Sequence, residues 1–230
     1  MIISHKYKYI FLKTNKTAGT SIEIALSKHC DHNDIITPIS AEDEAIRRDL
    51  GYPGPQNFMA SLRNYSIRDL ANFIRYRERK VDYYNHISAL EVKAKIGEEI
   101  WNSYYKFCFE RNPWDRIISH YYWHHKTEPR PEISDFILSG NPLILKKRGL
   151  DLYTIDDKIA VDKVCRFEDI TQELEEVRIK LGIPEKINLP RAKSKFRKDK
   201  RNYRDILSNS DNDNISRLFK DEIDLLGYKF

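Results

Sequence analysis

The sequence predicts an α/β domain in which a short parallel β-sheet is flanked by helices. Short apolar segments that suit buried strands occur at residues 7–12, 106–110 and 163–167, and each is followed by a loop and a helix-like segment. Strands that alternate with helices form parallel sheets with helices on their faces. The 230 residues, 40% of them hydrophobic, suit one domain with a sizeable core. We therefore expect residues 1–230 to form a single domain whose ligand site lies at the carboxyl ends of the strands.

The first strand and helix lie near the start of the chain. Residues 7–12 (YKYIFL) are aromatic and β-branched, as strand residues often are. A loop begins at Lys13 and contains Gly19, and the amphipathic run SIEIALSKH at residues 21–29 follows it. This order predicts a strand, a tight loop and a helix.

The segment of residues 31–84 shows no clear strand pattern. Its first part contains three prolines and two glycines, which favour irregular structure with one helical piece around residues 41–50. Residues 66–83 have apolar side chains near helical spacing and predict one or two helices. We expect residues 31–84 to be a variable insertion whose loops reach over the ligand site.

A further helix is predicted after His86. Ser88 and Glu91 have the spacing of a capping box, and the residues that follow favour helix up to about residue 100. His86 is therefore expected just before a helix N-terminus.

Two more strand and helix pairs complete the expected sheet. Residues 106–110 (KFCFE) suit a buried strand, and Pro113 suits the first turn of the next helix, where its missing N–H costs nothing. Residues 163–167 (KVCRF) predict a third strand, and a helix over residues 170–181 should end at Gly182. A helical stripe over residues 213–226 precedes the end of the chain.

The positive charge is concentrated in one basic loop, at about residues 189–204. Residues 191–204 contain eight Lys or Arg and one acid, a charge of +7, whereas the whole chain carries +5. An excess confined to one stretch indicates a local anionic partner. A solvated basic loop is the alternative.

Composition also excludes several classes of protein. No apolar run approaches the roughly 18 to 20 residues of a membrane span, and the first 15 residues lack the core of a signal peptide, so we expect a cytoplasmic protein. The cysteines, Cys30, Cys108 and Cys165, are odd in number and far apart, which suits neither a disulfide framework nor a zinc site. We expect reduced, mostly buried thiols.

The loop from Lys13 to Ser21 has the composition of an anion site. It combines lysine, glycine and four hydroxyls between a strand and the start of a helix, where N–H groups are unpaired. It is not a Walker A sequence, because Lys16 precedes Gly19 and the upstream glycine is missing. An ordinary capped helix start is the alternative.

A second loop, Arg111 to Tyr121, also suits a phosphate. Arg111 at a strand end can donate two N–H groups to one phosphate, and Ser119 can add a hydroxyl. The alternative is that Asp115 and Arg116 form a local ion pair and that Ser119 is an incidental helix residue.

Together the two loops resemble the carbohydrate-type (family 2-like) sulfotransferases that use 3′-phosphoadenosine 5′-phosphosulfate (PAPS). In that family a Lys-Thr-(Gly or Ala)-Gly-Thr-Ser loop cradles the 5′-phosphosulfate, and an Arg-Asn-Pro-x-Asp-Arg-x-x-Ser-x-Tyr segment holds the 3′-phosphate. Residues 16–21 and 111–121 match these patterns. Residues 166–169 (RFED) and 224–230 (DLLGYKF) resemble later family segments in the expected order. Asn15 departs from the family, which commonly has Pro there.

The resemblance implies a P-loop-like three-layer domain, with residues 31–84 on the acceptor side, and a set of site residues. Lys16 would stabilise the bridging oxygen of the leaving phosphate, and no metal would be needed. The cofactor contacts implied by the resemblance are Lys16, Thr17, Ala18, Gly19, Thr20 and Ser21 for the 5′ end and Arg111 and Ser119 for the 3′-phosphate. In the basic loop, Arg197 and Lys198 are the further candidates.

For the general base the sequence favours His86. A histidine titrates near neutral pH, and His86 lies between the two cofactor motifs, where related enzymes carry a catalytic histidine. Glu23 and Glu110 are the alternatives if His86 is structural. The competing histidines are His5, His29, His32, His120, His124 and His125, of which His120 and His124 are spaced to share a helix face and could form a metal pair.

The sequence therefore predicts transfer of a sulfuryl group from PAPS to a hydroxyl of a carbohydrate or polysaccharide. One rival is a Mg-dependent nucleotide kinase or phosphotransferase, with Glu110 as a metal ligand. The other is a non-catalytic module that binds polyanions through the basic loop. Only Phe196 and Tyr203 are aromatic in that loop, which argues against a nucleic-acid partner.

Overall fold

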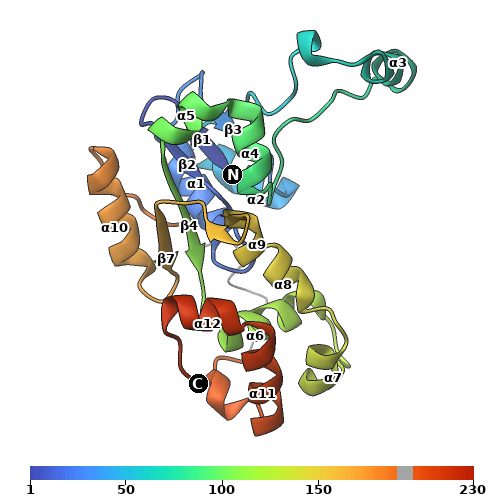
Figure 1. The fold of residues 1–230 in the computed structure, drawn as a ribbon, viewed down its shortest axis with the longest axis vertical. Helices are drawn as coiled ribbons and strands as arrows, with labels where there is room; N and C mark the ends of the chain where they lie inside the picture. Colours follow the sequence, from blue (N-terminus) through green and yellow to red (C-terminus); the bar gives the residue numbers. More distant parts are fainter. Residues whose placement is uncertain (191–198) are drawn as a thin grey trace.

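The computed structural model describes residues 1–190 and 199–230 (Figure 1). Its strands are β1 (Ile2–Ser4), β2 (Tyr9–Phe11), β3 (Ile35–Ile36), β4 (Tyr105–Glu110), β5 (Thr154–Ile155), β6 (Lys158–Ile159) and β7 (Lys163–Arg166). Its α-helices are α1 (Gly19–Ser27), α2 (Ala41–Asp49), α3 (Ile67–Tyr76), α4 (Ala89–Ile96), α5 (Glu98–Ser103), α6 (Pro113–His124), α7 (Ile133–Leu138), α8 (Leu143–Lys147), α9 (Leu150–Tyr153), α10 (Ile170–Leu181), α11 (Asn209–Leu218) and α12 (Lys220–Leu226). Short 3-10 turns cover Leu62–Asn64 and Tyr203–Asp205.

The central sheet has the strand order β3-β1-β2-β4-β7. The three predicted strands, β2, β4 and β7, run parallel to one another. The expectation of a purely parallel sheet is wrong at one edge, because β1 runs antiparallel to both β2 and β3. Only four residues join β1 to β2, and so short a connection can link only antiparallel strands.

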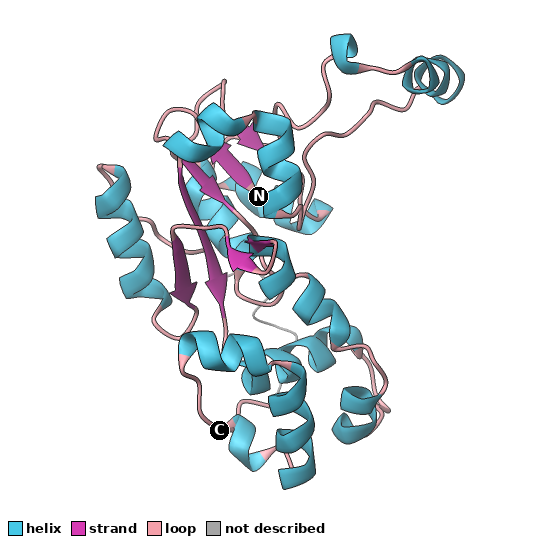
Figure 2. Ribbon diagram, viewed as in Figure 1, coloured by secondary structure: helices cyan, strands magenta, loops and turns pink. Residues whose placement is uncertain are grey.

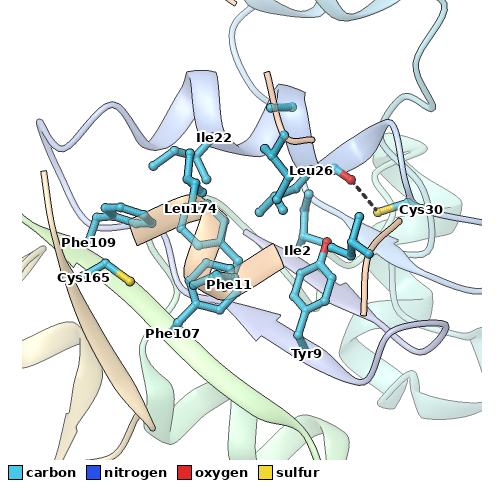
Figure 3. Close-up of a cluster of buried hydrophobic side chains, with 14 of the residues drawn as sticks. Ile2, Tyr9, Phe11, Ile22, Leu26, Cys30, Phe107, Phe109, Cys165 and Leu174 are labelled. Carbon is cyan, nitrogen blue, oxygen red and sulfur yellow. Dashed lines mark hydrogen bonds between the residues drawn. The ribbon is translucent and has the colours of Figure 1, made fainter. Parts of the chain in front are cut away.

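Side chains alternate between the two faces of the sheet and bury a helical layer on each. Tyr9, Phe11, Phe107 and Phe109 pack with α1 and α10, as Figure 3 shows. Their neighbours in sequence, among them Ile10 and Cys108, face α4, α5 and α9. The protein is therefore an α/β fold with helices on both faces of a mixed sheet (Figure 2).

A third core lies beyond the carboxyl ends of β4 and β7. There Trp114 and Ile117 of α6 pack with α8, α11 and α12. The stripe predicted as one helix over residues 213–226 is two helices, which meet at Phe219. These helices close the end of the sheet where the two loop motifs lie (Figure 1).

The helices predicted for the middle of the chain are confirmed in part. The capping box of Ser88 and Glu91 is present, but the helix predicted to reach about residue 100 is interrupted at Gly97, which has a positive φ of 82° and separates α4 from α5. The helix around residues 41–50 is confirmed as α2. Residues 66–83 yield only α3.

Two compositional expectations can be compared with the fold. All three cysteines are free and buried, as expected. Among the described residues no helix is both long enough and apolar enough to cross a membrane.

Candidate active site

A pocket of about 350 Å³ opens at the carboxyl ends of β2, β4 and β7. This is the edge of a parallel sheet where ligands of α/β proteins usually bind. Residues from both loop motifs and from the segment before α4 meet here. The lining residues are Lys13, Thr14, Asn15, Lys16, Ala18, Gly19, Thr20, Ser21, Asn85, His86, Arg111, Ser119, Trp123, Arg148 and Phe167.

The first loop turns sharply into α1. Lys16 and Ala18 both have left-handed backbone conformations, with φ of 66° and 59°. Thr17 is buried and its Oγ1 lies 2.8 Å from Thr14 Oγ1, so its side chain holds the loop together from within. The N–H groups of the first turn of α1, from Gly19 onward, have no partner within the helix and lie at the pocket wall.

Gly19 is needed for close packing in this turn. A Cβ atom at this position would lie 2.7 Å from Lys13 Cγ and 3.4 Å from the Thr14 carbonyl oxygen. Glycine therefore lets the start of α1 approach the end of β2.

Lys13 belongs to a buried charge network behind the loop. Its Nζ donates to Glu23 Oε2 at 2.8 Å, and Glu23 Oε1 accepts from Thr37 at 3.0 Å. Burial would raise the pKa of Glu23, but the charges of Lys13, the Met1 amino group and Arg47 outweigh it and lower the pKa to about 2. Glu23 is thus an ionised structural anchor, and it does not line the pocket.

The second loop places Arg111 across the pocket from the first. Arg111 Nε donates to Asp115 Oδ2 at 2.8 Å, its Nη1 donates to the Lys16 carbonyl at 3.2 Å, and its guanidinium lies 4.2 Å from the ring centre of Phe167. These contacts fix the guanidinium beside the first loop. Ser119, two turns into α6, lies on the same pocket wall.

Arg116 lies fully buried beneath both loops. It donates to Glu110 at 2.6 Å, to the Asn15 carbonyl at 3.0 Å and to the Leu145 carbonyl at 2.9 Å. The alternative pairing of Asp115 with Arg116 is therefore wrong, since Asp115 pairs with Arg111 and Arg116 with Glu110.

The second loop is also fastened to the end of the chain. The backbone N–H of Asn112 donates to Glu168 Oε1 at 2.8 Å, and Tyr228 donates to Glu168 Oε2 at 3.0 Å. The Asn112 side chain caps α6 through the N–H groups of Trp114 and Asp115. The segments at 166–169 and 224–230 thus support the loop from behind.

His86 faces this pocket with a defined tautomer. Its Nδ1 lies 2.7 Å from the Lys13 carbonyl oxygen, which can only accept, so Nδ1 carries the proton and Nε2 keeps its lone pair. Burial, followed by the charge of Lys13, lowers the pKa of His86 from 6.5 to about 4. The imidazole is therefore neutral at pH 7 and able to accept a proton.

A comparison with known protein families shows to which family the chain belongs. The model of the family described as "Sulfotransferase family" matches residues 1–229. The chain belongs to the sulfotransferase family. An uncharacterized protein of Archaeoglobus fulgidus is 26% identical over 103 residues, which cover 43% of this chain and 84% of that protein. No solved structure matches the chain.

The sulfotransferase brings most of the predicted site residues together. Those that line the pocket described above are Lys16, Ala18, Gly19, Thr20, Ser21, His86, Arg111 and Ser119. Thr17 lies behind the loop instead. Arg197 and Lys198 lie outside the described residues.

The competing residues of the sulfotransferase do not line this pocket, although His120 and His124 line a second cavity beside it. Glu110 is buried in the pair with Arg116, and burial raises its pKa to about 7. His5 bonds Tyr104 at 2.7 Å. His120 is buried against Phe136 and Trp123, and its ring centre lies 6.1 Å from that of His124. No group of three or more potential metal ligands occurs within residues 1–190 and 199–230.

Four lining residues were not predicted from the sequence. Trp123 lies four residues after Ser119 on α6, so helical spacing could have placed it on the same wall. Phe167 lies in a segment noted for its resemblance to the family. Asn85, whose buried Oδ1 has no partner, adjoins His86. No pattern in the sequence around Arg148 indicates a site residue, because this residue reaches the pocket only through the fold of the chain.

Proposed function

We propose that the protein transfers a sulfuryl group from PAPS to a hydroxyl of a carbohydrate or polysaccharide acceptor, with His86 as the general base. The observation that carries the proposal is that two anion-binding loops and a neutral histidine line one pocket. We also propose that residues 1–230 act as one domain, with residues 31–84 as its acceptor-side insertion.

The pocket suits a ligand with anionic groups at both ends. Lys16, Thr20 and Ser21 surround the start of α1, where a helix N-terminus favours negative charge. Arg111 and Ser119 form a second polar wall, which suits a 3′-phosphate. We infer that the first loop serves as the phosphate cradle of a P-loop-like fold despite its different sequence. Bound PAPS would supply the sulfuryl group and a bisphosphate as leaving group.

The catalytic roles follow from protonation and charge. His86 Nε2 takes the proton of the acceptor hydroxyl while that oxygen bonds to sulfur and the bond from sulfur to the phosphate oxygen breaks. Lys16 then stabilises the negative charge that develops on the departing phosphate oxygen. A fixed tautomer and a fixed guanidinium reduce the reorganisation that the reaction requires.

The pocket walls support a sugar as the acceptor. Trp123 is partly exposed on the wall and also lines a second, adjoining cavity with Asn141 and Lys147. An aromatic face with nearby hydrogen-bonding groups suits a ring that has an apolar face and a polar rim. We propose that the acceptor lies against Trp123.

The geometry of the site gives less support to the two rival functions. A kinase of the expected type would offer Glu110 to a metal, but this carboxylate is buried and accepts from Arg116 at 2.6 Å. A module that only binds polyanions has no need of a half-buried neutral histidine whose tautomer is fixed.

Calorimetric titration with 3′-phosphoadenosine 5′-phosphate, without metal, tests the cofactor. We expect tight binding that weakens when the ligand lacks its 3′-phosphate and that weakens strongly in Arg111→Ala. Tighter binding of ATP with Mg²⁺ would support the kinase. Equal binding by Arg111→Ala and the wild type would remove Arg111 from the site.

Turnover of PAPS with a panel of saccharides tests the base. We expect His86→Gln to bind the bisphosphate normally and to lose roughly a hundredfold or more in rate, the scale of a lost general base. His32→Gln, an exposed histidine outside the pocket, is the matched control. Parallel losses of binding and rate in His86→Gln would make His86 a structural residue.

A further inference from the structure

One part of the insertion projects from the rest of the molecule as an arm, which we define as residues 60–80. Figures 1 and 2 show α3 at its tip, standing apart from the sheet and its helical layers. No residue of α3 is buried. The arm therefore contributes almost nothing to the cores described above.

The arm nevertheless has internal contacts of its own. Its base is closed by backbone bonds from Ala60 N–H to the Lys80 carbonyl at 2.9 Å and by a bridge between Met59 and Val81. Within it, Lys80 N–H donates to Tyr65 Oη at 2.9 Å, and the ring of Tyr65 packs edge-on against Phe73. A complete capping box at Ser66 starts α3.

α3 presents an apolar stripe to the outside. Ile67, Leu70 and Ile74 are spaced to share one helix face, and their exposed fractions are 88%, 42% and 76%. Large aliphatic side chains clustered on an exposed surface generally mark a contact with a partner.

The same arm is strongly basic. It carries six Lys or Arg and two acids, Asp69 and Glu78, a net charge of +4. Asp69 is already paired with Lys80 at 2.8 Å. The remaining arginines are exposed, and Arg68 and Arg75 lie on α3 itself.

We propose that the arm binds the surface of an anionic phospholipid membrane, with the apolar stripe of α3 inserted at the interface. α3 is a short amphipathic helix with aliphatic side chains on one face and arginines beside them. The aliphatic side chains suit the apolar part of the membrane interface, and the arginines suit its anionic headgroups. Two arms of +4 repel each other, which disfavours pairing with a second copy. A soluble polyanion would match the arginines but would leave Ile67 and Ile74 in water.

The base of the arm leads directly to the active site. Its returning segment pairs with Met59 at Val81, and Tyr83 N–H donates to the Phe58 carbonyl at 3.0 Å, two residues before Asn85 of the pocket. Binding of α3 to a membrane would thus tether the domain that holds the pocket to that surface. A saccharide attached to that membrane would reach the pocket without a diffusive search in solution.

Vesicle flotation tests the proposal with the full chain. We expect the wild type to float with vesicles of two parts phosphatidylcholine to one part phosphatidylglycerol, and not with phosphatidylcholine alone. Ile67→Ser/Ile74→Ser should lower the partition coefficient at least about tenfold, since two aliphatic side chains no longer insert. Arg68→Gln/Arg75→Gln should lower it by a similar factor and reduce its salt dependence.

The matched control is Leu138→Ser/Ile179→Ser, which removes two other exposed aliphatic side chains, 69% and 63% exposed, outside the arm. It should float like the wild type. Unchanged binding of the bisphosphate shows that each variant is folded.

Three results would overturn the proposal. Equal flotation with both kinds of vesicle would remove the role of the arginines. Wild-type flotation of Ile67→Ser/Ile74→Ser, together with equal binding of dextran sulfate by that variant and the wild type, would identify a soluble polyanion as the ligand. A wild-type dimer in sedimentation velocity that the same variant converts to a monomer would identify a second copy as the partner.

Discussion

Replacing Arg116 by Met should destabilise the protein by about 3–5 kcal/mol, because the change leaves a buried carboxylate without its partner. The guanidinium is fully buried and bonds Glu110 and the carbonyls of Asn15 and Leu145. Met has a similar length and fills much of the same space. The cost therefore comes from lost hydrogen bonds and an unpaired charge more than from a cavity.

The loss of unfolding free energy in Arg116→Met should depend on pH, because Glu110 titrates. Its pKa in the folded protein is about 7, above the ordinary 4.5, so its burial lowers stability progressively as the pH rises from 4.5 through 7. Without Arg116 the folded pKa rises further, and the penalty then grows by the full 1.4 kcal/mol per pH unit. Integration between pH 5.5 and 7.5 gives an extra destabilisation of about 1 kcal/mol in the variant relative to the wild type.

Urea unfolding at these two pH values measures both effects. The double variant Glu110→Gln/Arg116→Met is the control, because it removes the carboxylate together with its partner. It should be more stable than Arg116→Met alone at pH 7.5, and its loss relative to Glu110→Gln should not vary with pH. If the two single losses simply add, or if Arg116→Met costs less than about 1 kcal/mol, the buried pair does not support the loops as we describe.

The remaining predictions concern the groups around the first loop. Since the pKa of His86 in the free enzyme is lowered to about 4, kcat/KM should stay level down to about pH 5 and fall with a midpoint near 4, whereas a midpoint near 6.5 would contradict the described burial. Glu23→Gln should cost about 3 kcal/mol of unfolding free energy at pH 7, because its pKa is lowered from 4.5 to about 2, and this difference should shrink as the pH falls below 4.5. Gly19→Ala should weaken binding of the bisphosphate roughly tenfold by displacing Lys13, as calorimetry can measure, while Gly54→Ala, whose Cβ meets nothing within 4 Å, should bind like the wild type.

Elements with a local signal could be predicted from the sequence. The strands at residues 106–110 and 163–167 and the helix at residues 170–181 were predicted within a residue of their observed bounds, because apolar runs and stop signals are properties of the chain itself. β1 could not be predicted in this way. It has three residues, all buried, and its place depends on pairing with β2 and β3.

The site residues that belong to a recognisable sequence motif could be predicted from the sequence. The incorrect pairing of Asp115 with Arg116 shows the limit of reasoning from adjacency, since consecutive residues on a helix point in different directions. Asp115 instead reaches back four residues to Arg111, and Arg116 reaches Glu110 at the end of β4. Contacts of this kind depend on where the helix begins.

Asn15 shows how the structure compensates for a departure from the family pattern. Its N–H donates to the Arg148 carbonyl at 2.8 Å, a bond that proline cannot make, and its own carbonyl accepts from Arg116 at 3.0 Å. These two bonds hold the backbone from both sides, just before Lys16 enters its left-handed conformation. The rigidity that a proline ring would provide within the loop is supplied by the neighbouring elements. The same bond holds the backbone of Arg148 beside the loop, and the side chain of Arg148 lines the pocket.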